Sequence, residues 1–453
     1  SISCSNKIES TTVTFSDDIA TIIHTNCTPC HRPNSAGPFS LITYNDVLKK
    51  AKTIVKVTQS RYMPPWPADA SYTHFVGERL LAQDDIDKIK LWVDAGCPIG
   101  DSTKIPSPKK YPAGSMIGEP DMRIYFPDTI FIEGNNLDHF FLAKVPYILS
   151  DSILKNEACK YVKAIEFVPA NKKYLHHMNA NLINYGVGQK KNVFEGDNYI
   201  PTNLAEDATS LQKRMNNLND DGSYPIYFIP NVSNYLPGVS PAIYPEGIGG
   251  FEMCETGTFF INDIHFGPSP VDTFDTNSYF NIFFTDVEPQ RQTYDVVLGS
   301  LSKVAPVTPQ LIVPANEIKT FYVRWKTEKD YSLLTINPHM HLIGKEFLAY
   351  ALTPQNDTIR LIHIPKWNFR WQYFYTFKNP VKIPSGSTIV VEGIYDNTAS
   401  NPNNPFDPPQ VIIDRASPLE SMRTTDEMLQ FIITLMPYQE GDENINLENV
   451  PLK

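Results

Sequence analysis

The stretch Cys27-Thr28-Pro29-Cys30-His31 determines how the first part of this 453-residue chain is expected to fold. Two cysteines separated by two residues and followed at once by a histidine form the attachment site of a c-type haem. Cys27 and Cys30 would form thioethers to the porphyrin, and His31 would ligate the iron from one side. A thioredoxin-like dithiol or half of a zinc site is the alternative, but neither explains the histidine that follows directly.

Two expected helices frame the haem motif. The first opens at Phe15, with Ser16 as its cap and two acids in its first turn. The second opens at Asp84-Asp85 and stops near Gly96. A short helix before the motif and another that closes the domain are typical of class I cytochromes c. We therefore expect a small all-α cytochrome c domain over residues 1–104.

The sixth iron ligand is expected to be a methionine or a histidine further along the chain. Met63 lies in Arg61-Tyr62-Met63-Pro64-Pro65-Trp66, where flanking prolines stiffen the loop that would hold a weak thioether on iron. His74 is the alternative ligand, and a methionine that merely fills the core is the alternative role for Met63. Methionine opposite histidine raises the haem potential and suits electron transfer, so we predict Met63 as the ligand.

The pattern changes after a proline-rich linker over residues 105–117. Short apolar or β-branched runs then recur between turn residues, for example Ile124–Phe126, Phe259–Ile261 and Thr388–Val391. Such runs predict antiparallel β-sandwiches or jelly rolls. The clearest expected strand is Trp367–Phe377, whose aromatic residues alternate at period two. That aromatic face is expected to be core, and a substrate platform is the alternative.

Histidines form three tight sets in this β-rich part. They are His176-His177, His265, and His339-Met340-His341. Residues two apart on a strand share a face, so His339 and His341 can reach one metal, whereas a tandem pair can converge only at a bulge or a strand end. Three imidazole sets with few other soft ligands indicate copper or zinc. The remaining histidines are interpreted as structural or surface groups: His24, His74, His139 and His363.

The order of these motifs resembles the type II copper, ascorbate-dependent monooxygenases, which include the peptidylglycine α-hydroxylating and dopamine β-monooxygenases. The resemblance extends over about residues 118–440. It rests on Gly118-Glu119-Pro120-Asp121, His339 to Lys345, Thr425-Asp426-Glu427-Met428, and the stretch from Tyr395-Asp396-Asn397 through Asn401-Pro402 to Asn404-Pro405. The last stretch resembles a bacterial branch in which this module follows a haem domain.

The resemblance implies two sandwich domains with one copper ion each. The domain over residues 118–297 would bind one copper through His176, His177 and His265. The domain over residues 298–453 would bind the other through His339, His341 and Met428, which are the expected catalytic residues. The implied reaction is hydroxylation of an unactivated C–H bond of a small organic substrate with O2. The fused haem is expected to replace ascorbate as the electron donor, itself reduced by an external donor.

Two departures from the family separate this chain from the peptidylglycine enzymes. Asn337 occupies the position of the arginine that anchors the peptide carboxylate there, and Ile432 replaces a tyrosine that follows the methionine ligand. A peptide ending in glycine is therefore not the expected substrate. Two rival functions stay open: a non-catalytic haem and copper protein for electron transfer or copper binding, and a surface binding module that uses the aromatic face.

The cysteines and the charge indicate the compartment and the partners. With two of six cysteines on haem, a Cys4–Cys97 disulfide is plausible because these residues flank the first and last helices. The four remaining cysteines allow three pairings, and Cys159 with Cys254 is the pairing expected within the copper module. Lipidation at Cys4 is the weaker interpretation and would allow membrane association through a lipid anchor only. Attached haem and disulfides predict a bacterial periplasmic, cell-surface or secreted protein, and a net charge of −11 argues against nucleic acid.

Overall fold

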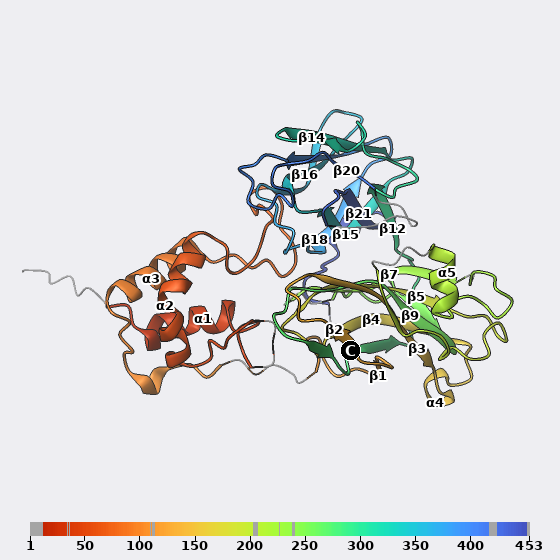
Figure 1. The fold of residues 1–453 in the computed structure, drawn as a ribbon, viewed down its shortest axis with the longest axis horizontal. Coiled ribbons are helices and arrows are strands. Elements are labelled where there is room, and N and C mark those ends of the chain that lie inside the picture. Colours follow the sequence, from red (N-terminus) through yellow and green to blue (C-terminus); the bar gives the residue numbers. More distant parts are fainter. Residues whose placement is uncertain are drawn as a thin grey trace, which may run out of the picture. The chain divides into compact units, whose positions relative to one another are not determined.

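The computed structural model describes residues 12–450 apart from positions 34, 36, 109, 111–113, 203–206, 226, 238–240 and 416–423. The chain forms two compact units (Figure 1). Unit 1 comprises residues 1–66 and 78–111, and unit 2 comprises residues 67–77 and 112–453. The domain expected over residues 1–104 is therefore interrupted by a short segment, residues 67–77, that packs within unit 2.

Helices are the described elements of unit 1. They are η1 (Phe15–Ile19), α1 (Ala20–Asn26), α2 (Tyr44–Gln59), α3 (Gln83–Asp94) and η2 (Ser102–Lys104). All but η2 contribute residues to one apolar core, in which the rings of Phe15 and Trp92 lie 6.0 Å apart. The expected cap at Ser16 is wrong, because Thr14 is the capping residue and its hydroxyl accepts the Asp17 N–H, while Ser16 is already helical.

The first half of unit 2 consists of two facing antiparallel sheets and a two-stranded ribbon. The sheets have the strand orders β1-β11-β4-β8 and β6-β3-β9-β5-β7, and β10 pairs with β2. Phe259 of β9 stacks on Phe280 of β11 at 4.3 Å within the core that both sheets share. The elements are β1 (Met122–Tyr125), β2 (Ile130–Ile132), β3 (His139–Ile148), α4 (Asp151–Leu154), β4 (Cys159–Val168), β5 (Leu175–Asn184), β6 (Tyr199–Pro201), α5 (Ala208–Arg214), β7 (Tyr227–Tyr235), β8 (Phe251–Cys254), β9 (Thr256–Phe266), β10 (Thr273–Asp275) and β11 (Tyr279–Thr285).

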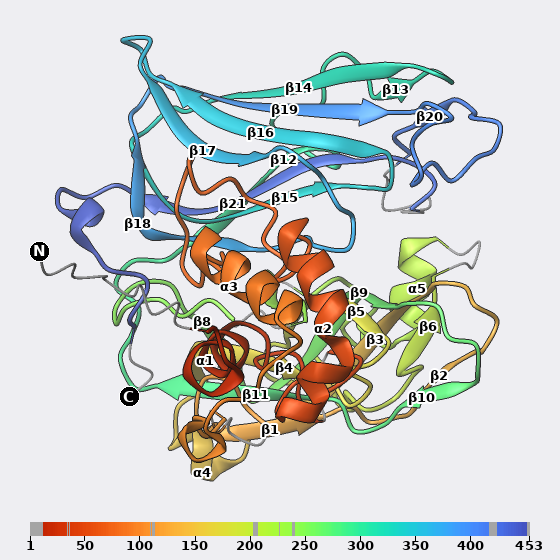
Figure 2. The same ribbon diagram turned by 90° about the vertical axis from the view of Figure 1, so that its left-hand side faces the viewer.

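The second half of unit 2 repeats this plan. A sheet of order β12-β21-β15-β18 faces a sheet of order β14-β19-β16-β17, and β13 pairs with β20 (Figure 2). Phe347 of β16 packs against Phe431 of β21 at 5.7 Å, so the larger part of the chain has the antiparallel β architecture that the sequence predicts. The elements are β12 (Tyr294–Gly299), β13 (Ile312–Val313), β14 (Ile318–Lys326), β15 (Tyr331–Met340), β16 (Gly344–Leu352), β17 (Thr358–Ile364), β18 (Tyr375–Ile383), β19 (Thr388–Asp396), β20 (Ile412–Ile413), β21 (Leu429–Pro437) and η3 (Asp442–Asn444).

The expected single strand over residues 367–377 is wrong. Strand β18 begins only at Tyr375, and residues 365–374 form a loop, which we call the aromatic loop. The Trp367 indole N–H donates to the His341 carbonyl, and the Trp371 N–H donates to the Asn368 carbonyl in a turn. These bonds draw the first half of the aromatic run away from the sheet, although the alternating pattern itself is compatible with a strand.

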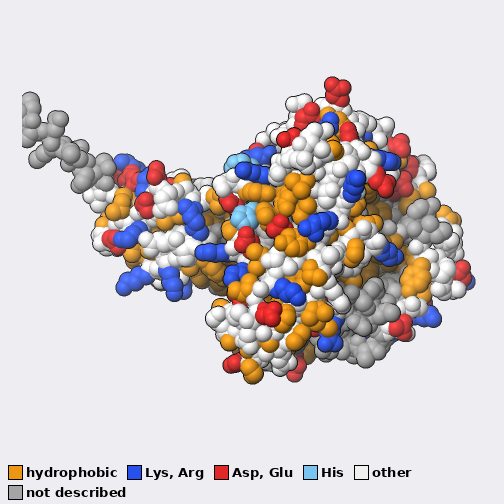
Figure 3. Space-filling view, turned by 90° about the horizontal axis from the view of Figure 1, so that it is seen from above, with side chains coloured by type: hydrophobic (Ala, Val, Ile, Leu, Met, Phe, Trp, Pro, Cys, Tyr) orange, Lys and Arg blue, Asp and Glu red, His pale blue; other side chains and the backbone are white. Residues whose placement is uncertain are grey.

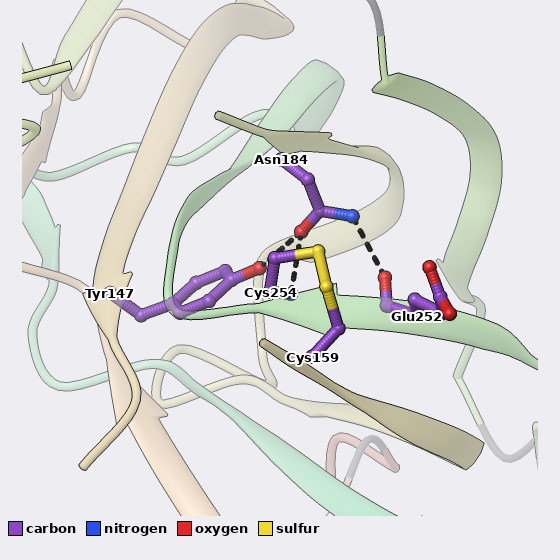
Figure 4. The surroundings of a disulfide bond; sticks show 5 residues. All are labelled: Tyr147, Cys159, Asn184, Glu252 and Cys254. Atoms are coloured by element: carbon purple, nitrogen blue, oxygen red, sulfur yellow. Dashed lines mark hydrogen bonds between the residues drawn. A yellow bond between two sulfur atoms is a disulfide. The ribbon is translucent and has the colours of Figure 1, made fainter. Parts of the chain in front are cut away.

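The disulfide between Cys159 and Cys254 joins neighbouring strands β4 and β8, which confirms this predicted pairing. Asn184 fixes the surroundings of the bond (Figure 4). Its side-chain oxygen accepts hydrogen bonds from the Tyr147 hydroxyl and the Cys254 N–H, at 2.9 and 3.0 Å. Its amide donates to the Glu252 carbonyl at 2.8 Å. A disulfide in this position is compatible with a protein that works outside the reducing cytoplasm.

Two expectations concern the N-terminus and the surface. Cys4 lies outside the described residues, so its pairing with Cys97 and its lipidation stay predictions. In the described part of the chain, no helix has the length and apolar character that a membrane crossing requires. Basic and acidic side chains are interspersed on the face of the molecule drawn in Figure 3.

A buried ion pair stabilises unit 2. The Asp442 carboxylate accepts hydrogen bonds from the Arg291 guanidinium, the Ser332 hydroxyl and the Gln439 N–H. Its side chain is only 4% exposed. Burial raises the pKa of Asp442, but these hydrogen bonds and the charge of Arg291 outweigh that effect and lower the pKa from 3.8 to about 2.

We expect the Asp442→Asn substitution to lower the free energy of unfolding by about 2 kcal/mol at neutral pH. The carboxylate has a lower pKa in the folded state than in the unfolded state. Its contribution to the free energy of unfolding is therefore complete above pH 3.8 and is lost as the pH falls toward about 2. Urea unfolding followed by circular dichroism at both ends of this range measures the difference. The exposed Asp357→Asn variant is the control, and an equal effect of both substitutions would contradict the prediction.

Candidate metal centres

The first histidine set lies on the neighbouring strands β5 and β9. Leu175 pairs with Phe266 and His177 pairs with His265, so His176 is the extra residue of a β-bulge. The bulge turns the tandem histidines toward the same place, and nitrogen atoms of His176, His177 and His265 all lie within 4.8 Å of one another. The prediction that the tandem pair converges at a bulge is confirmed.

Two carboxylates orient the rings of this set. The Nε2 atom of His177 lies 2.6 Å from Asp263, and the Nε2 atom of His265 lies 2.7 Å from Asp138. A histidine whose one nitrogen is held by a carboxylate binds a metal through its other nitrogen. Burial, together with the charges of His265 and His177, lowers the pKa of His176 to about 3. The ring is therefore neutral at physiological pH, the form that binds metal ions.

One atom of this set lacks a partner. The Nδ1 atom of His265 is buried and has no hydrogen-bond partner among the described residues, while its Nε2 atom is held by Asp138. Buried polar atoms are normally satisfied, so this nitrogen is open to a ligand such as a water molecule or a metal ion. An ion bound by three imidazoles would satisfy it, and such a donor set suits copper or zinc.

The second histidine set lies at the end of β15. The rings of His339 and His341 are 5.0 Å apart. The Nδ1 atom of His339 contacts the Gln372 side-chain oxygen, and the Nδ1 atom of His341 lies 3.0 Å from the Asp426 carbonyl oxygen. Burial, with the charge of His341, lowers the pKa of His339 to about 3. Both rings thus have the held Nδ1 atom that is typical of histidine ligands.

Glu427 connects this set to Met428. Its carboxylate, 1% exposed, accepts the N–H groups of His341, Ile343 and Met428 at 2.9, 2.8 and 3.3 Å. The Met428 carbonyl in turn accepts the Tyr395 hydroxyl at 2.6 Å. Burial raises the pKa of Glu427 to about 8, although the three N–H groups oppose this. The structure therefore brings the Met428 backbone next to the chain that carries His341.

The aromatic loop, which sequence reasoning did not connect with either set, has side chains at both. Phe369 lies 5.7 Å from the His341 ring, and Gln372 holds His339. The charge of Arg370 contributes to the lowered pKa of His176 in the first set. The charges of His177 and Asp263 also act on the pKa of His339. These contacts join residues far apart in the chain, and no spacing in the sequence predicts them.

The CxxCH residues lie at the end of α1 in unit 1. Cys27 follows the last residue of the helix, and the His31 N–H donates to the Cys27 carbonyl at 2.8 Å. The Nδ1 atom of His31 lies 3.2 Å from the Phe39 carbonyl oxygen. Gly37 packs against the ring, where a Cβ atom would lie 2.7 Å from Nδ1. These contacts hold the His31 ring by its Nδ1 atom, and Cys27, Cys30 and His31 are the residues that would hold a c-type haem.

The structure separates the two candidates for the sixth iron ligand. Met63 belongs to the same compact unit as His31, and its N–H donates to the Val57 carbonyl at the end of α2. His74 belongs to the segment that packs within unit 2. Met63 as the sixth ligand, with His74 as the alternative, stays a prediction. The other histidines have partners in the protein: the Ile42 carbonyl for His24, the Glu133 carbonyl for His139, and Asp69 and Glu346 for His363.

We expect Met63→His to lower the haem reduction potential and to abolish the weak far-red absorption band of methionine-ligated ferric haem, because a thioether stabilises the reduced iron. A redox titration and a visible spectrum of the purified protein measure both effects. His74→Ala is the matched control and should change neither. The assignment is wrong if the wild type lacks the band or if His74→Ala removes it.

Comparisons with known proteins give no family for this chain. No family model matches it, and no curated protein matches it. Among solved structures, the chain is matched to a structure of infectious bursal disease virus Gt strain at 10% identity, covering 76% of this chain and 77% of that one, with a TM-score of 0.17. The corresponding values for the Gx strain are 9%, 76%, 76% and 0.16. Similarity this low bears on neither fold nor function.

Proposed function

We propose that this protein is a copper monooxygenase that hydroxylates an unactivated C–H bond of a small organic substrate with O2, using electrons supplied through a c-type haem on unit 1. The observation that supports it most is the orphaned Nδ1 atom of His265, buried beside His176 and His177. Three converging imidazoles that leave one buried nitrogen without a partner form a donor set that suits a metal ion.

The first histidine set would hold an electron-relay copper ion. Asp138 and Asp263 hold the Nε2 atoms of His265 and His177, which fixes the rings before any metal arrives. His265 is only 1% exposed, so the metal would be screened from solvent on that side. These residues supply three nitrogen donors in fixed orientation. A copper ion held by them would exchange electrons without a large rearrangement of its ligands.

The second set would hold the catalytic copper ion through His339, His341 and Met428. Copper bound there would supply the one-electron chemistry that activates O2 for hydrogen abstraction, and a thioether donor favours its reduced form. The protein's own contribution is positional: Gln372 orients His339, and Glu427 fixes the chain at both His341 and Met428. Phe369 packs against the His341 ring at 5.7 Å.

Asn337 helps to define the substrate class. Its amide donates to the Tyr373 carbonyl at 3.0 Å, and its side chain is 8% exposed. In the peptidylglycine enzymes, the resemblance implies that an arginine at this position binds the substrate carboxylate. An amide that is buried against the main chain is not available for that role. This supports a substrate other than a peptide that ends in glycine.

Attached haem and a disulfide also support a periplasmic, cell-surface or secreted location.

The test is oxygen consumption by copper-loaded protein with a chemical reductant, screened against a metabolite library. We expect substrate-dependent O2 uptake and a product heavier by one oxygen atom in mass spectrometry. His339→Ala should abolish both and leave the haem spectrum unchanged. Copper binding and electron transfer without O2 uptake for any compound would instead support the non-catalytic electron-transfer protein.

A further inference from the structure

The chain makes a long excursion between strands β5 and β7, which contains the short strand β6 and helix α5. The excursion has an apolar cluster of its own, in which Val193 and Met215 pack with Tyr185. The Tyr185 hydroxyl donates to the Asn217 carbonyl at 3.1 Å. Tyr185 follows the last residue of β5, whereas His177 lies near its start, about 25 Å away along an extended strand. This part of the excursion is therefore far from the first histidine set.

Two buried lysines hold the walls of the excursion in place. The Lys190 ammonium donates to the Asn216 side-chain oxygen at 2.8 Å and to the Leu218 carbonyl. The Lys144 ammonium of β3 donates to the Glu195 carbonyl on the other wall. Burying a charged group is costly unless it is hydrogen-bonded, so these contacts keep both walls in a fixed position.

A polar cavity of about 440 Å³ opens between the two walls. One molecule of liquid water takes up about 30 Å³, so this volume suits a small organic molecule better than a single ion. The charged residues that line the cavity are two lysines and two acids, namely Lys191, Lys213, Glu195 and Asp220. Leu218 is the one apolar side chain among its described lining residues. The lining therefore suits a polar ligand.

One buried oxygen atom at the cavity lacks a partner. Asn219 lines the cavity and is 6% exposed. Its side-chain nitrogen donates to the Ser223 hydroxyl at 2.9 Å, and its backbone N–H donates to the Ser223 carbonyl at 2.9 Å. Its Oδ1 atom has no hydrogen-bond partner among the described residues. Buried acceptors are normally satisfied, so this oxygen is open to an N–H or O–H group of a ligand or of water.

The charges of the lining exclude the simplest ligands. The two lysines would repel a metal cation, and the two carboxylates would repel an inorganic anion. Neither Lys191 nor Lys213 forms an ion pair with a described residue, so both ammonium groups are available. A molecule that has one positive and one negative group satisfies both halves of the lining.

We propose that this cavity binds a small zwitterion, namely a free amino acid with an uncharged polar side chain. Its carboxylate is bound by Lys191 and Lys213, its ammonium group by Glu195 and Asp220, and one of its N–H or O–H groups donates to the Asn219 Oδ1 atom. The inference goes beyond the proposed function and does not depend on it, because no expected ligand of copper or haem lines the cavity.

The first test needs no variant of the protein. Isothermal titration calorimetry of the full chain measures the binding of L-glutamine, with L-leucine as the apolar control. Two analogues each lack one charge of L-glutamine: glutaramate has no ammonium group, and γ-aminobutyramide has no carboxylate. We expect L-glutamine to bind at one site per chain, and the control and both analogues to bind about tenfold more weakly or worse.

Two double variants then assign each charge to its partner. Lys191→Met with Lys213→Met should weaken L-glutamine binding by about tenfold but bind γ-aminobutyramide no more weakly than the wild type, since this analogue has no carboxylate. Glu195→Gln with Asp220→Asn should show the reverse pattern, with glutaramate as the unaffected analogue. Lys303→Met, at an exposed lysine outside the excursion, is the control and should bind like the wild type.

The four substituted side chains are exposed, so circular dichroism and copper content should be the same in all variants. The inference is overturned if the wild type does not bind L-glutamine or binds L-leucine equally well. Unchanged L-glutamine binding in both double variants would overturn it as well, because the ligand would then lie elsewhere on the protein.

Discussion

Glu427→Ala should lower the free energy of unfolding by about 3 kcal/mol and empty the second metal set, because three buried N–H groups lose their acceptor together. These groups belong to His341, Ile343 and Met428, so the same substitution releases two of the expected ligands from one another. Urea unfolding and copper analysis after dialysis measure the two effects.

Two further variants separate position from charge at this site. Glu427→Gln keeps one acceptor oxygen and should lose less stability than Glu427→Ala. Glu440→Ala, at an exposed glutamate that follows β21, should leave both stability and copper content unchanged. If Glu427→Ala unfolds like the wild type and keeps its full copper content, Glu427 does not hold the second set together.

Met428→His should retain copper and still accept electrons, yet lose hydroxylation. Loss of a residue that only orients a ligand costs about 10–100-fold in activity, and we expect a larger loss here. An imidazole binds harder than a thioether and favours Cu(II), whereas a thioether favours the reduced ion that reacts with O2. Substrate-dependent O2 uptake and the copper content of the same samples measure the separation.

A methionine of the core provides the control for this substitution. Met436 is fully buried on β21, and Met436→Leu conserves its volume, so this variant should keep both copper and activity. Full hydroxylase activity in Met428→His would show that the sulfur is not needed for oxygen chemistry, and the second set would then be a structural or electron-transfer site.

The alternation of strands allowed the histidine sets to be predicted from the sequence. A period of two places His339 and His341 together, and the same rule requires a bulge for His176 and His177, which the structure contains. The expected pairing of Cys159 with Cys254, one of the three pairings that four free cysteines allow, is also confirmed. These predictions rest on local geometry that any strand must obey.

Sequence patterns were less reliable where contacts between distant parts of the chain determine the local structure. The aromatic run before Tyr375 has the alternation of a strand. It is held as a loop at the second histidine set, because the Trp367 indole donates to the His341 carbonyl and the Gln372 side-chain oxygen contacts His339. Helix α2 was missed although its start has a readable signal. The Thr43 hydroxyl and the Asp46 carboxylate form a capping box there, and a search for this pair would have found the helix.

The residues that orient the metal ligands could not be predicted from spacing. Asp263 lies two residues before His265 yet holds His177, and Asp138 holds His265 across 127 residues of sequence. Both contacts depend on which strands become neighbours, a property of the whole sheet. Segment 67–77 is a similar case, because it lies between two parts of unit 1 in the sequence but packs within unit 2.

A copper titration of the purified protein tests the central claim, that unit 2 holds two separate metal sets, most directly. We predict two copper ions per chain in the wild type, and one in each of His265→Ala and His339→Ala, with the resonance signals of magnetically independent Cu(II). A single copper ion in the wild type, or the loss of all copper on either substitution, would contradict the account.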